Sequence, residues 1–320
     1  MHFKLLPAVF FLAFFVNCQQ PSPKNQSEPV TSQEVFPIVG WGDSMMGGSG
    51  TDRSLTEYLS DELNRETLNF GVGGITSEAV AILQGGKPFY AHLEGNRLPD
   101  KGKTIVTNLG VDPINKQTSS FREVEIEGVP GTLSRKYVNE PPYKTIHYEF
   151  ERTKNGTIKE VMDTCIVQFK DALENRSNPV IIWAGRNDPK KGNEIYKTRD
   201  NIQSMLDYLM PEDGKKKFLI LSVCNGSSKK ESKGSNPYNE IMALNQLLKE
   251  SFGEGYIDIR SYLVNDAMRK LGLEPTEDDL KEIKADCIPK SLRSDEVHLN
   301  DNGNRAIAIY LAEIIQKRGY

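Results

Sequence analysis

Short apolar runs alternate with amphipathic stretches along most of the chain, and this alternation limits the folds open to it more than any other feature. The apolar runs predict strands at residues 36–41, 67–70, 180–184, 218–223 and 256–259. The amphipathic stretches predict helices near residues 54–65, 158–175, 197–210, 238–252 and 302–317. Strands and helices in alternation are typical of an α/β fold with a mostly parallel sheet. We therefore expect one α/β domain over residues 35–320.

Residues 85–157 interrupt this alternation. The segments 103–109, 122–129 and 145–152 favour strand, and Asn155-Gly156 is a dipeptide typical of tight turns. We expect a small β-rich insert in this part of the domain. Such an insert either reaches the functional cleft and sets specificity, or serves as a structural or oligomer contact.

The first residues resemble an export signal. Lys4 supplies a positive charge, and residues 5–16 form an apolar run of signal-peptide length, shorter than the about 20 residues that span a bilayer. The Phe-Val-Asn-Cys sequence ending at Cys18 is similar to the lipobox of bacterial lipoproteins, in which the cysteine is lipidated. We therefore expect a signal peptide of lipoprotein type at 1–18; an ordinary cleaved signal peptide is the alternative.

Residues 19–34 are polar and proline-rich, so they predict a disordered linker ahead of the folded domain. Both interpretations of the N-terminus predict an exported protein. We expect it in the periplasm or at the outer membrane or cell surface as a lipoprotein, or secreted if Cys18 is not modified.

Charge and cysteine content exclude several partners. The chain has 40 Lys and Arg against 44 Asp and Glu, a formal charge of −4 with no dominant basic block, so we expect no nucleic acid. Cys165, Cys224 and Cys287 are widely spaced, with neither CxxC pairs nor nearby histidines, which argues against a metal site. A single disulfide between two of these three cysteines is the remaining alternative. We expect no cofactor, and the sequence leaves the oligomeric state undetermined.

Three short motifs follow predicted strands. They are Gly-Asp-Ser at 42–44, a glycine-rich turn at 71–74, and Gly-Arg-Asn-Asp at 185–188. Parallel strands end at one edge of a sheet, where open α/β folds place their ligands. Taken singly, each motif is also ordinary turn chemistry. The glycine-rich turn lacks the G-x-G-x-x-G spacing of a dinucleotide site.

A fourth motif, Asp-Glu-Val-His at 295–298, precedes the last predicted helix. The chain has four histidines, of which His2 would be removed with the signal, while His92 and His147 lie in the predicted insert. His298 is therefore the candidate base, and Asp295 is close enough in sequence to orient its imidazole.

The four motifs in this order resemble those of the SGNH (GDSL) hydrolase superfamily, over about residues 35–84 and 160–317. The stretch 288–303 strengthens the resemblance. The resemblance implies a three-layer α/β/α sandwich with a mostly parallel central sheet, the flavodoxin-like SGNH hydrolase fold. It also implies Ser44 as the nucleophile, with His298 and Asp295 as its partners. The implied oxyanion hole comprises the N–H of Ser44, the N–H of Gly74 (or Gly73 if the turn is offset) and the Asn187 side chain.

The resemblance implies a serine esterase that forms and hydrolyses an acyl-enzyme. An exported enzyme without a wide apolar stripe suits O-deacetylation of an extracellular or cell-envelope polysaccharide, with an acetylated glycan as substrate. Two alternatives remain: a lysophospholipase or thioesterase of the same superfamily, and an inactive glycan-binding surface lipoprotein. A lipid on Cys18 would add the membrane as a partner.

Overall fold

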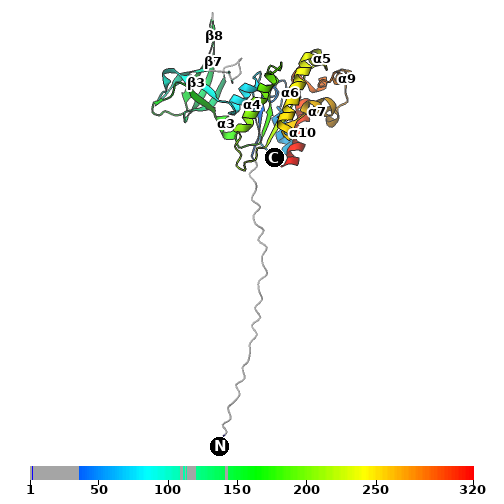
Figure 1. Ribbon diagram of the computed structural model, residues 1–320, viewed down its shortest axis with the longest axis horizontal. Helices are drawn as coiled ribbons and strands as arrows, with labels where there is room; N and C mark the ends of the chain where they lie inside the picture. Colours follow the sequence, from blue (N-terminus) through cyan, green and yellow to red (C-terminus); the bar gives the residue numbers. More distant parts are fainter. Residues whose placement is uncertain (1, 3–35, 109–110, 112, 114–119, 141–142) are drawn as a thin grey trace. The chain divides into compact units, whose positions relative to one another are not determined.

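The computed structural model describes residues 2, 36–108, 111, 113, 120–140 and 143–320 (Figure 1). The predicted signal peptide, Cys18 and almost all of the linker lie outside these residues. Within the described part, five parallel strands form one sheet in the order β13-β12-β11-β1-β2. They are β1 (Ile38–Gly42), β2 (Thr67–Gly71), β11 (Val180–Trp183), β12 (Phe218–Leu221) and β13 (Tyr256–Ile257). Counted along the chain this is the 2-1-3-4-5 order of flavodoxin-like folds.

Helices cover both faces of the sheet, because successive strand residues point to opposite sides. Val39 and Trp41 belong to one apolar cluster and Ile38 to the other. The first cluster includes α2 (Ser77–Gln84), α4 (Glu194–Tyr208) and α6 (Asn236–Phe252). The second includes α1 (Leu55–Leu63), α7 (Ile259–Asn265), α8 (Ala267–Leu271) and α10 (Asp301–Arg318). The predicted α/β/α sandwich is therefore confirmed.

Local signals set the start of α1 and the end of α10. Ser54 and Glu57 form a capping box at the start of α1, which satisfies backbone N–H groups that have no partner within the helix. Gly319 ends α10 with φ of 64°, a left-handed conformation that glycine adopts without steric cost.

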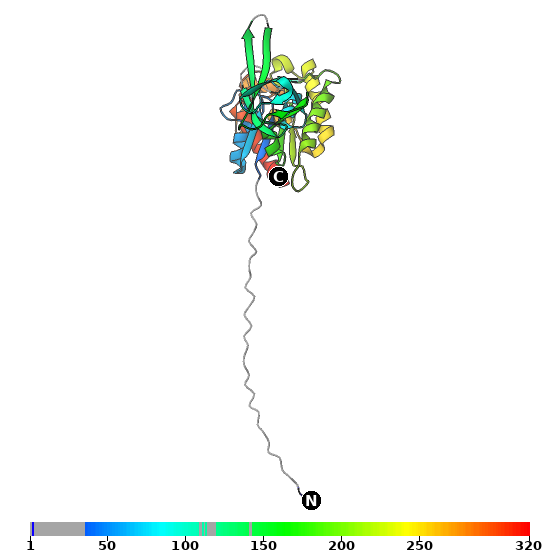
Figure 2. The same ribbon diagram turned by 90° about the vertical axis from the view of Figure 1, so that its left-hand side faces the viewer.

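The predicted β-rich insert is a closed antiparallel barrel. Among the described residues its six strands pair in the order β10-β3-β5-β8-β7-β6, with β10 closing onto β6; Figure 2 shows the barrel facing the viewer. The strands are β3 (Phe89–Leu93), β5 (Lys103–Asn108), β6 (Ser120–Ile126), β7 (Val129–Glu140), β8 (Tyr143–Arg152) and β10 (Cys165–Phe169). A 3-10 turn, η1 (Glu94–Asn96), and a two-stranded pair, β4 (Arg97–Leu98) with β9 (Lys159–Glu160), flank it.

The helix predicted over 158–175 is wrong for most of its length. Cys165, Val167 and Phe169 are buried while the two residues between them are exposed, so the pattern has the period of a strand, which becomes β10. Only α3 (Lys170–Asn175) is helical, and the barrel extends beyond the predicted end at residue 157.

The last predicted strand is also shorter than 256–259. It ends at Ile257, because the Asp258 side chain accepts a hydrogen bond from the Ser261 N–H and caps α7. The remaining elements are α5 (Ser228–Glu231), η2 (Gly253–Gly255), α9 (Glu277–Lys284) and η3 (Lys290–Leu292).

The cysteines of the folded domain form no disulfide. Cys165, Cys224 and Cys287 are all free and buried. The described residues hold no group of three or more His, Cys, Asp or Glu side chains arranged to bind a metal. Within the same residues, no helix combines the length and apolar character needed to cross a bilayer.

Candidate active site

The predicted motifs meet at one point on the sheet edge. β1 lies between β2 and β11, and the chain continues from β1 to one side and from β11 to the other. Loops that diverge in this way leave a crevice beyond the strand ends, where α/β folds bind ligands. Ser44 follows β1 at this crevice, and Asn187 follows β11. The topology therefore explains why these two distant motifs become neighbours.

Ser44, His298 and Asp295 form one chain of hydrogen bonds. His298 Nε2 lies 3.0 Å from Ser44 Oγ, and His298 Nδ1 lies 2.8 Å from Asp295 Oδ2. Both distances suit a hydroxyl nucleophile paired with an imidazole base that a carboxylate orients. The structure thus brings together the three residues that the sequence singled out, although they come from loops 254 positions apart.

The Asp295 carboxylate is held in its ionised form. Its Oδ1 accepts the backbone N–H groups of Val297 and His298, both at 2.6 Å. Burial raises the pKa of this carboxyl, but the hydrogen bonds from the His298 ring and from these two N–H groups outweigh it and bring the pKa to about 2. Asp295 therefore stays negative at any pH at which His298 could act as a base.

Asn187 reaches the same crevice from the other loop. Its Nδ2 donates to the carbonyl of Ile75 at 2.9 Å, which ties it to the glycine-rich turn. A side-chain amide has a second N–H, and this one is not engaged by the Ile75 bond. Gly74 is exposed with φ of 75°, and a Cβ there would meet nothing within 4 Å.

Two aspartates, Asp43 and Asp188, stabilise these loops. The sequence showed them only as members of the Gly-Asp-Ser and Gly-Arg-Asn-Asp motifs and assigned them no role. Asp43, 1% exposed, accepts the Met45 N–H at 3.0 Å and the Arg186 N–H at 3.3 Å, so it joins the loops after β1 and β11. Burial raises the pKa of its carboxyl to about 6, although both hydrogen bonds lower it. Asp188 accepts the Ser77 N–H at 2.7 Å and the Thr198 hydroxyl at 2.6 Å. The available signal in the sequence was their position: Asp43 directly precedes the nucleophile, and Asp188 directly follows the asparagine whose amide reaches the crevice.

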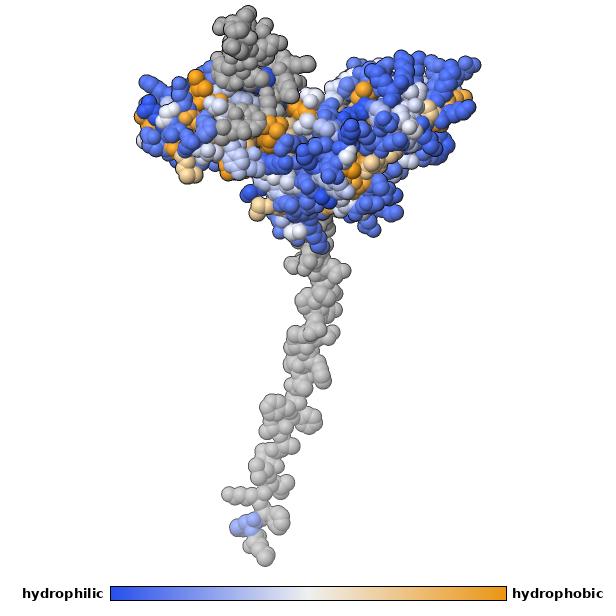
Figure 3. Space-filling model, turned by 45° about the horizontal axis from the view of Figure 1, so that its top comes forward, coloured by the Kyte–Doolittle hydropathy of each residue, from blue (hydrophilic) through white to orange (hydrophobic). Residues whose placement is uncertain are grey.

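A cavity of about 500 Å³ opens beside Ser44. Ser44, Asn187 and His298 line it; Gly73, Gly74 and Asp295 do not. Much of the remaining wall is charged or polar, and its members include Arg186, Asp188, Lys190, Glu231 and Glu240. On the face drawn in Figure 3 hydrophilic residues likewise predominate, with apolar ones scattered among them.

An ion pair forms part of this wall. The Arg186 guanidinium lies 2.8 Å from Glu231 Oε1, with each side chain 14% exposed. Lys190 Nζ donates to the carbonyls of Arg186 at 2.7 Å and Asp188 at 2.9 Å. Burial, and then the nearby Arg186, lower the pKa of Lys190. The sequence did not predict this pairing, because Glu231 lies at the end of α5, 45 residues after Arg186.

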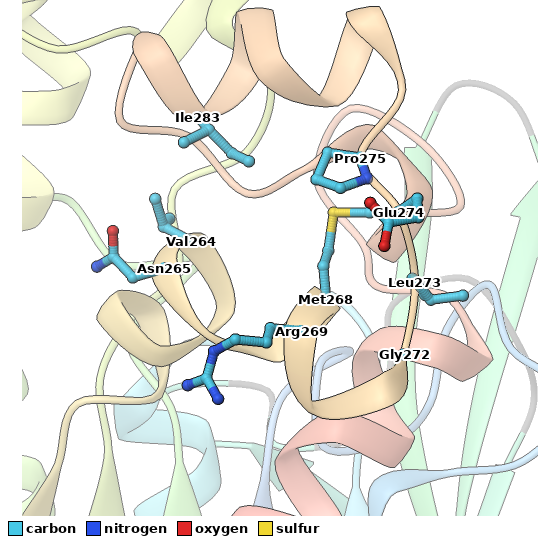
Figure 4. A pocket seen from close by; sticks show the side chains of 9 residues that line it. All are labelled: Val264, Asn265, Met268, Arg269, Gly272, Leu273, Glu274, Pro275 and Ile283. Atoms are coloured by element: carbon cyan, nitrogen blue, oxygen red, sulfur yellow. The ribbon is translucent and has the colours of Figure 1, made fainter.

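A second cavity, of about 280 Å³, lies among α7, α8 and α9 (Figure 4). Val264, Met268, Leu273 and Ile283 supply apolar side chains to its lining, and it shares no lining residue with the cavity beside Ser44. Its lining residues include no serine, cysteine or histidine. It therefore lacks a serine–histidine pair like that of the cavity beside Ser44.

Comparisons with known proteins yield distant similarities. No family model matches the chain. A tail spike protein of Salmonella phage epsilon15 is 21% identical over 291 residues, covering 83% of this chain; the chain spans only 26% of that protein. A solved structure described as a lipolytic protein of the G-D-S-L family, from Desulfitobacterium hafniense DCB-2, is 10% identical with a TM-score of 0.42, covering 87% of this chain and 99% of its own.

A solved peptidoglycan O-acetylesterase is 12% identical with a TM-score of 0.40, covering 89% of this chain and 92% of its own. Similarities of this size assign no activity to the chain.

Proposed function

We propose that the chain is a serine esterase of the SGNH (GDSL) type, with Ser44 as nucleophile. The observation that carries the proposal is the hydrogen-bonded series from Ser44 through His298 to Asp295, at 3.0 and 2.8 Å. A serine hydroxyl is a weak nucleophile unless an adjacent base accepts its proton. This geometry supplies such a base at the edge of an open cavity.

In the proposed reaction, His298 Nε2 takes the Ser44 proton as Oγ attacks the ester carbonyl. The N–H groups of Ser44 and Gly74 and the second N–H of Asn187 stabilise the negative charge that develops on the carbonyl oxygen. His298 then protonates the leaving alcohol. Water, deprotonated by His298, hydrolyses the acyl-enzyme and restores Ser44.

We propose an O-acetylated polysaccharide as the substrate. The cavity wall supports this choice, because Arg186, Glu231 and Lys190 offer hydrogen bonds to sugar hydroxyls. A fatty acyl chain would instead need an extended apolar channel, and here Ile241 and Val297 are the main apolar side chains beside two prolines. An acetyl group requires little apolar surface.

We also propose that the enzyme is exported as a lipoprotein, on the strength of the N-terminal sequence pattern. Cys18→Ser should move the protein from the membrane fraction to the soluble fraction of cells that express it. If Cys18→Ser associates with the membrane fraction to the same extent as the parent protein, lipidation at this residue is contradicted.

The substrate proposal is tested by acetate release from a panel of acetylated glycans, compared with fatty-acid release from lysolipids. We expect acetate from at least one glycan and little fatty acid. Ser44→Ala should abolish release and prevent labelling by a fluorophosphonate probe. Fatty-acid release alone would favour a lysophospholipase, and an unlabelled parent protein would favour an inactive glycan-binding protein.

A further inference from the structure

The backbone beside Asp295 is anchored from two sides. The Arg293 guanidinium donates from NH1 to the Asp295 carbonyl at 2.8 Å, and the Ser227 N–H donates to the Glu296 carbonyl at 2.9 Å. Gly226 permits the second approach, because a Cβ on it would collide with the Glu296 carbonyl oxygen. Two consecutive carbonyls of the loop are thus held by groups outside it or at its start.

Arg293 is itself fixed by burial and pairing. The residue is 9% exposed, and its Nε donates to the Ile288 carbonyl at 3.0 Å. Its NH2 lies 3.1 Å from Glu282 Oε1 on α9. The other oxygen of Glu282 accepts the Ser228 N–H at 2.7 Å, next to the Ser227 anchor. One carboxylate, of a side chain that is 13% exposed, therefore connects both anchors of the loop.

The Asp295 side chain needs this support because little else orients it. It is 55% exposed, so packing does not hold it in place. Its Oδ1 bonds only to N–H groups of its own loop, those of Val297 and His298. The direction of the carboxylate therefore follows the backbone path of the loop, and the contact with the His298 ring follows from that direction.

We propose that Arg293 is a positioning residue, which holds the Asp295 backbone so that the carboxylate meets His298. The inference rests on the proposed esterase function. A planar guanidinium suits the role because it donates in several fixed directions at once, here to two carbonyls and a carboxylate.

The test separates positioning from simple stability. Arg293→Met leaves Glu282 buried without its partner, so the melting temperature should fall. The double variant Arg293→Met with Glu282→Gln removes both charges and should restore much of the melting temperature. Its turnover on a small acetyl ester should nevertheless stay about 10- to 100-fold below the parent value with little change in KM, because the Asp295 carbonyl is still unheld.

Arg260→Met is the matched control. Arg260 is also buried, 7% exposed, and pairs with Asp286 at 2.8 Å. Its side-chain hydrogen bonds go to Asn225 and Asp286 and not to residues 295–298. It should lose stability comparably and keep parental turnover at a temperature where it is folded. Arg293→Lys, which retains one donor group, should recover part of the lost turnover.

Four outcomes decide the matter. Parental turnover in the folded double variant would overturn the positioning role, as would an equal loss of turnover in Arg260→Met. A parent protein without esterase activity and without fluorophosphonate labelling at Ser44 would overturn the proposed function itself, and the inference with it. Reduced turnover confined to the Arg293 variants would support the proposal.

Discussion

The parallel sheet and the inserted barrel organise their residues in opposite ways. The loops after β1 and β11 contribute Ser44 and Asn187 to one cavity, and the segment between η3 and α10 adds His298. The barrel closes on itself, so its alternate residues fill an interior that includes Phe150 and Val167. None of the described barrel residues lines the cavity beside Ser44. An open parallel sheet places side chains from several loops at one edge. A closed barrel instead pairs the edges of all its strands and encloses its own apolar interior.

The barrel also enters and leaves the domain at one place. Its first and last strands, β3 and β10, are hydrogen-bonded neighbours with Phe89 opposite Val167. The chain therefore departs after α2 and returns before α3 without rearranging the parallel sheet. This geometry explains how a large insert coexists with an intact site.

Removing the oxyanion amide should have the largest effect and only on the sheet region's chemistry. Asn187→Ala should lower turnover by about 100- to 1,000-fold, since one donor to the developing charge is lost. KM and melting temperature should change little. Asn193→Ala, an exposed asparagine that makes no side-chain cap to α4, is the control and should be fully active. Equal losses in both variants would contradict the role of Asn187.

A cavity in the barrel should lower stability without touching the chemistry. Phe150 is 0% exposed, so Phe150→Ala should cost about 3–5 kcal/mol in the free energy of unfolding. Turnover per folded molecule should match the parent. Met46→Ala, also 0% exposed but two residues after Ser44, should reduce both stability and turnover. Denaturant titration and ester kinetics measure the two quantities, and a turnover loss in Phe150→Ala would break the proposed separation.

The buried carboxyl of Asp43 should make the sheet region sensitive to pH. Its pKa of about 6 in the folded protein exceeds the value of 3.8 expected when unfolded, so the folded state retains the proton more strongly. Stability contributed by this group therefore falls as pH rises from about 4 to 6, by about 2 kcal/mol.

Asp43→Asn removes this titration. The free energy of unfolding of Asp43→Asn, minus that of the parent, should increase by about 2 kcal/mol between pH 4 and pH 7. Hydrogen bonds lost by the amide add a constant offset that does not depend on pH. A difference in the free energy of unfolding that does not change over this pH range would show that burial does not raise the pKa of the Asp43 carboxyl.

Loss of the barrel should have the smallest effect on the chemical step. Replacement of residues 89–169 by a short Gly-Ser linker should leave hydrolysis of a small acetyl ester unchanged in protein that circular dichroism shows to be folded. Tyr90→Ala, which alters a 46% exposed side chain on β3, poses the same question without a deletion. A changed preference among acetylated glycans in either variant would assign the barrel a role in specificity.

Much of the α/β framework was predictable because its signals are local. Apolar runs of strand length, the capping box at Ser54 and the stop at Gly319 act within a few residues. The segment 158–175 was misassigned because its apolar spacing suits either a helix or a strand over so short a length. Only pairing with β3 and β6, which lie 39 or more residues earlier, selects the strand at β10.

Ser44 and Asn187 could be nominated because residues that follow parallel strands emerge at the same edge of the sheet. His298 and Asp295 could be nominated because they lie three residues apart in the motif that precedes the last helix, and the SGNH resemblance implied the roles of all four. Tertiary structure decided what surrounds them: the pairing of Arg186 with Glu231, the grip of Arg293 on the Asp295 carbonyl, and the closure of the barrel. Charge pairs between separate segments and strand register across a barrel depend on how residues far apart in the sequence pack together. No local pattern of residues encodes that packing.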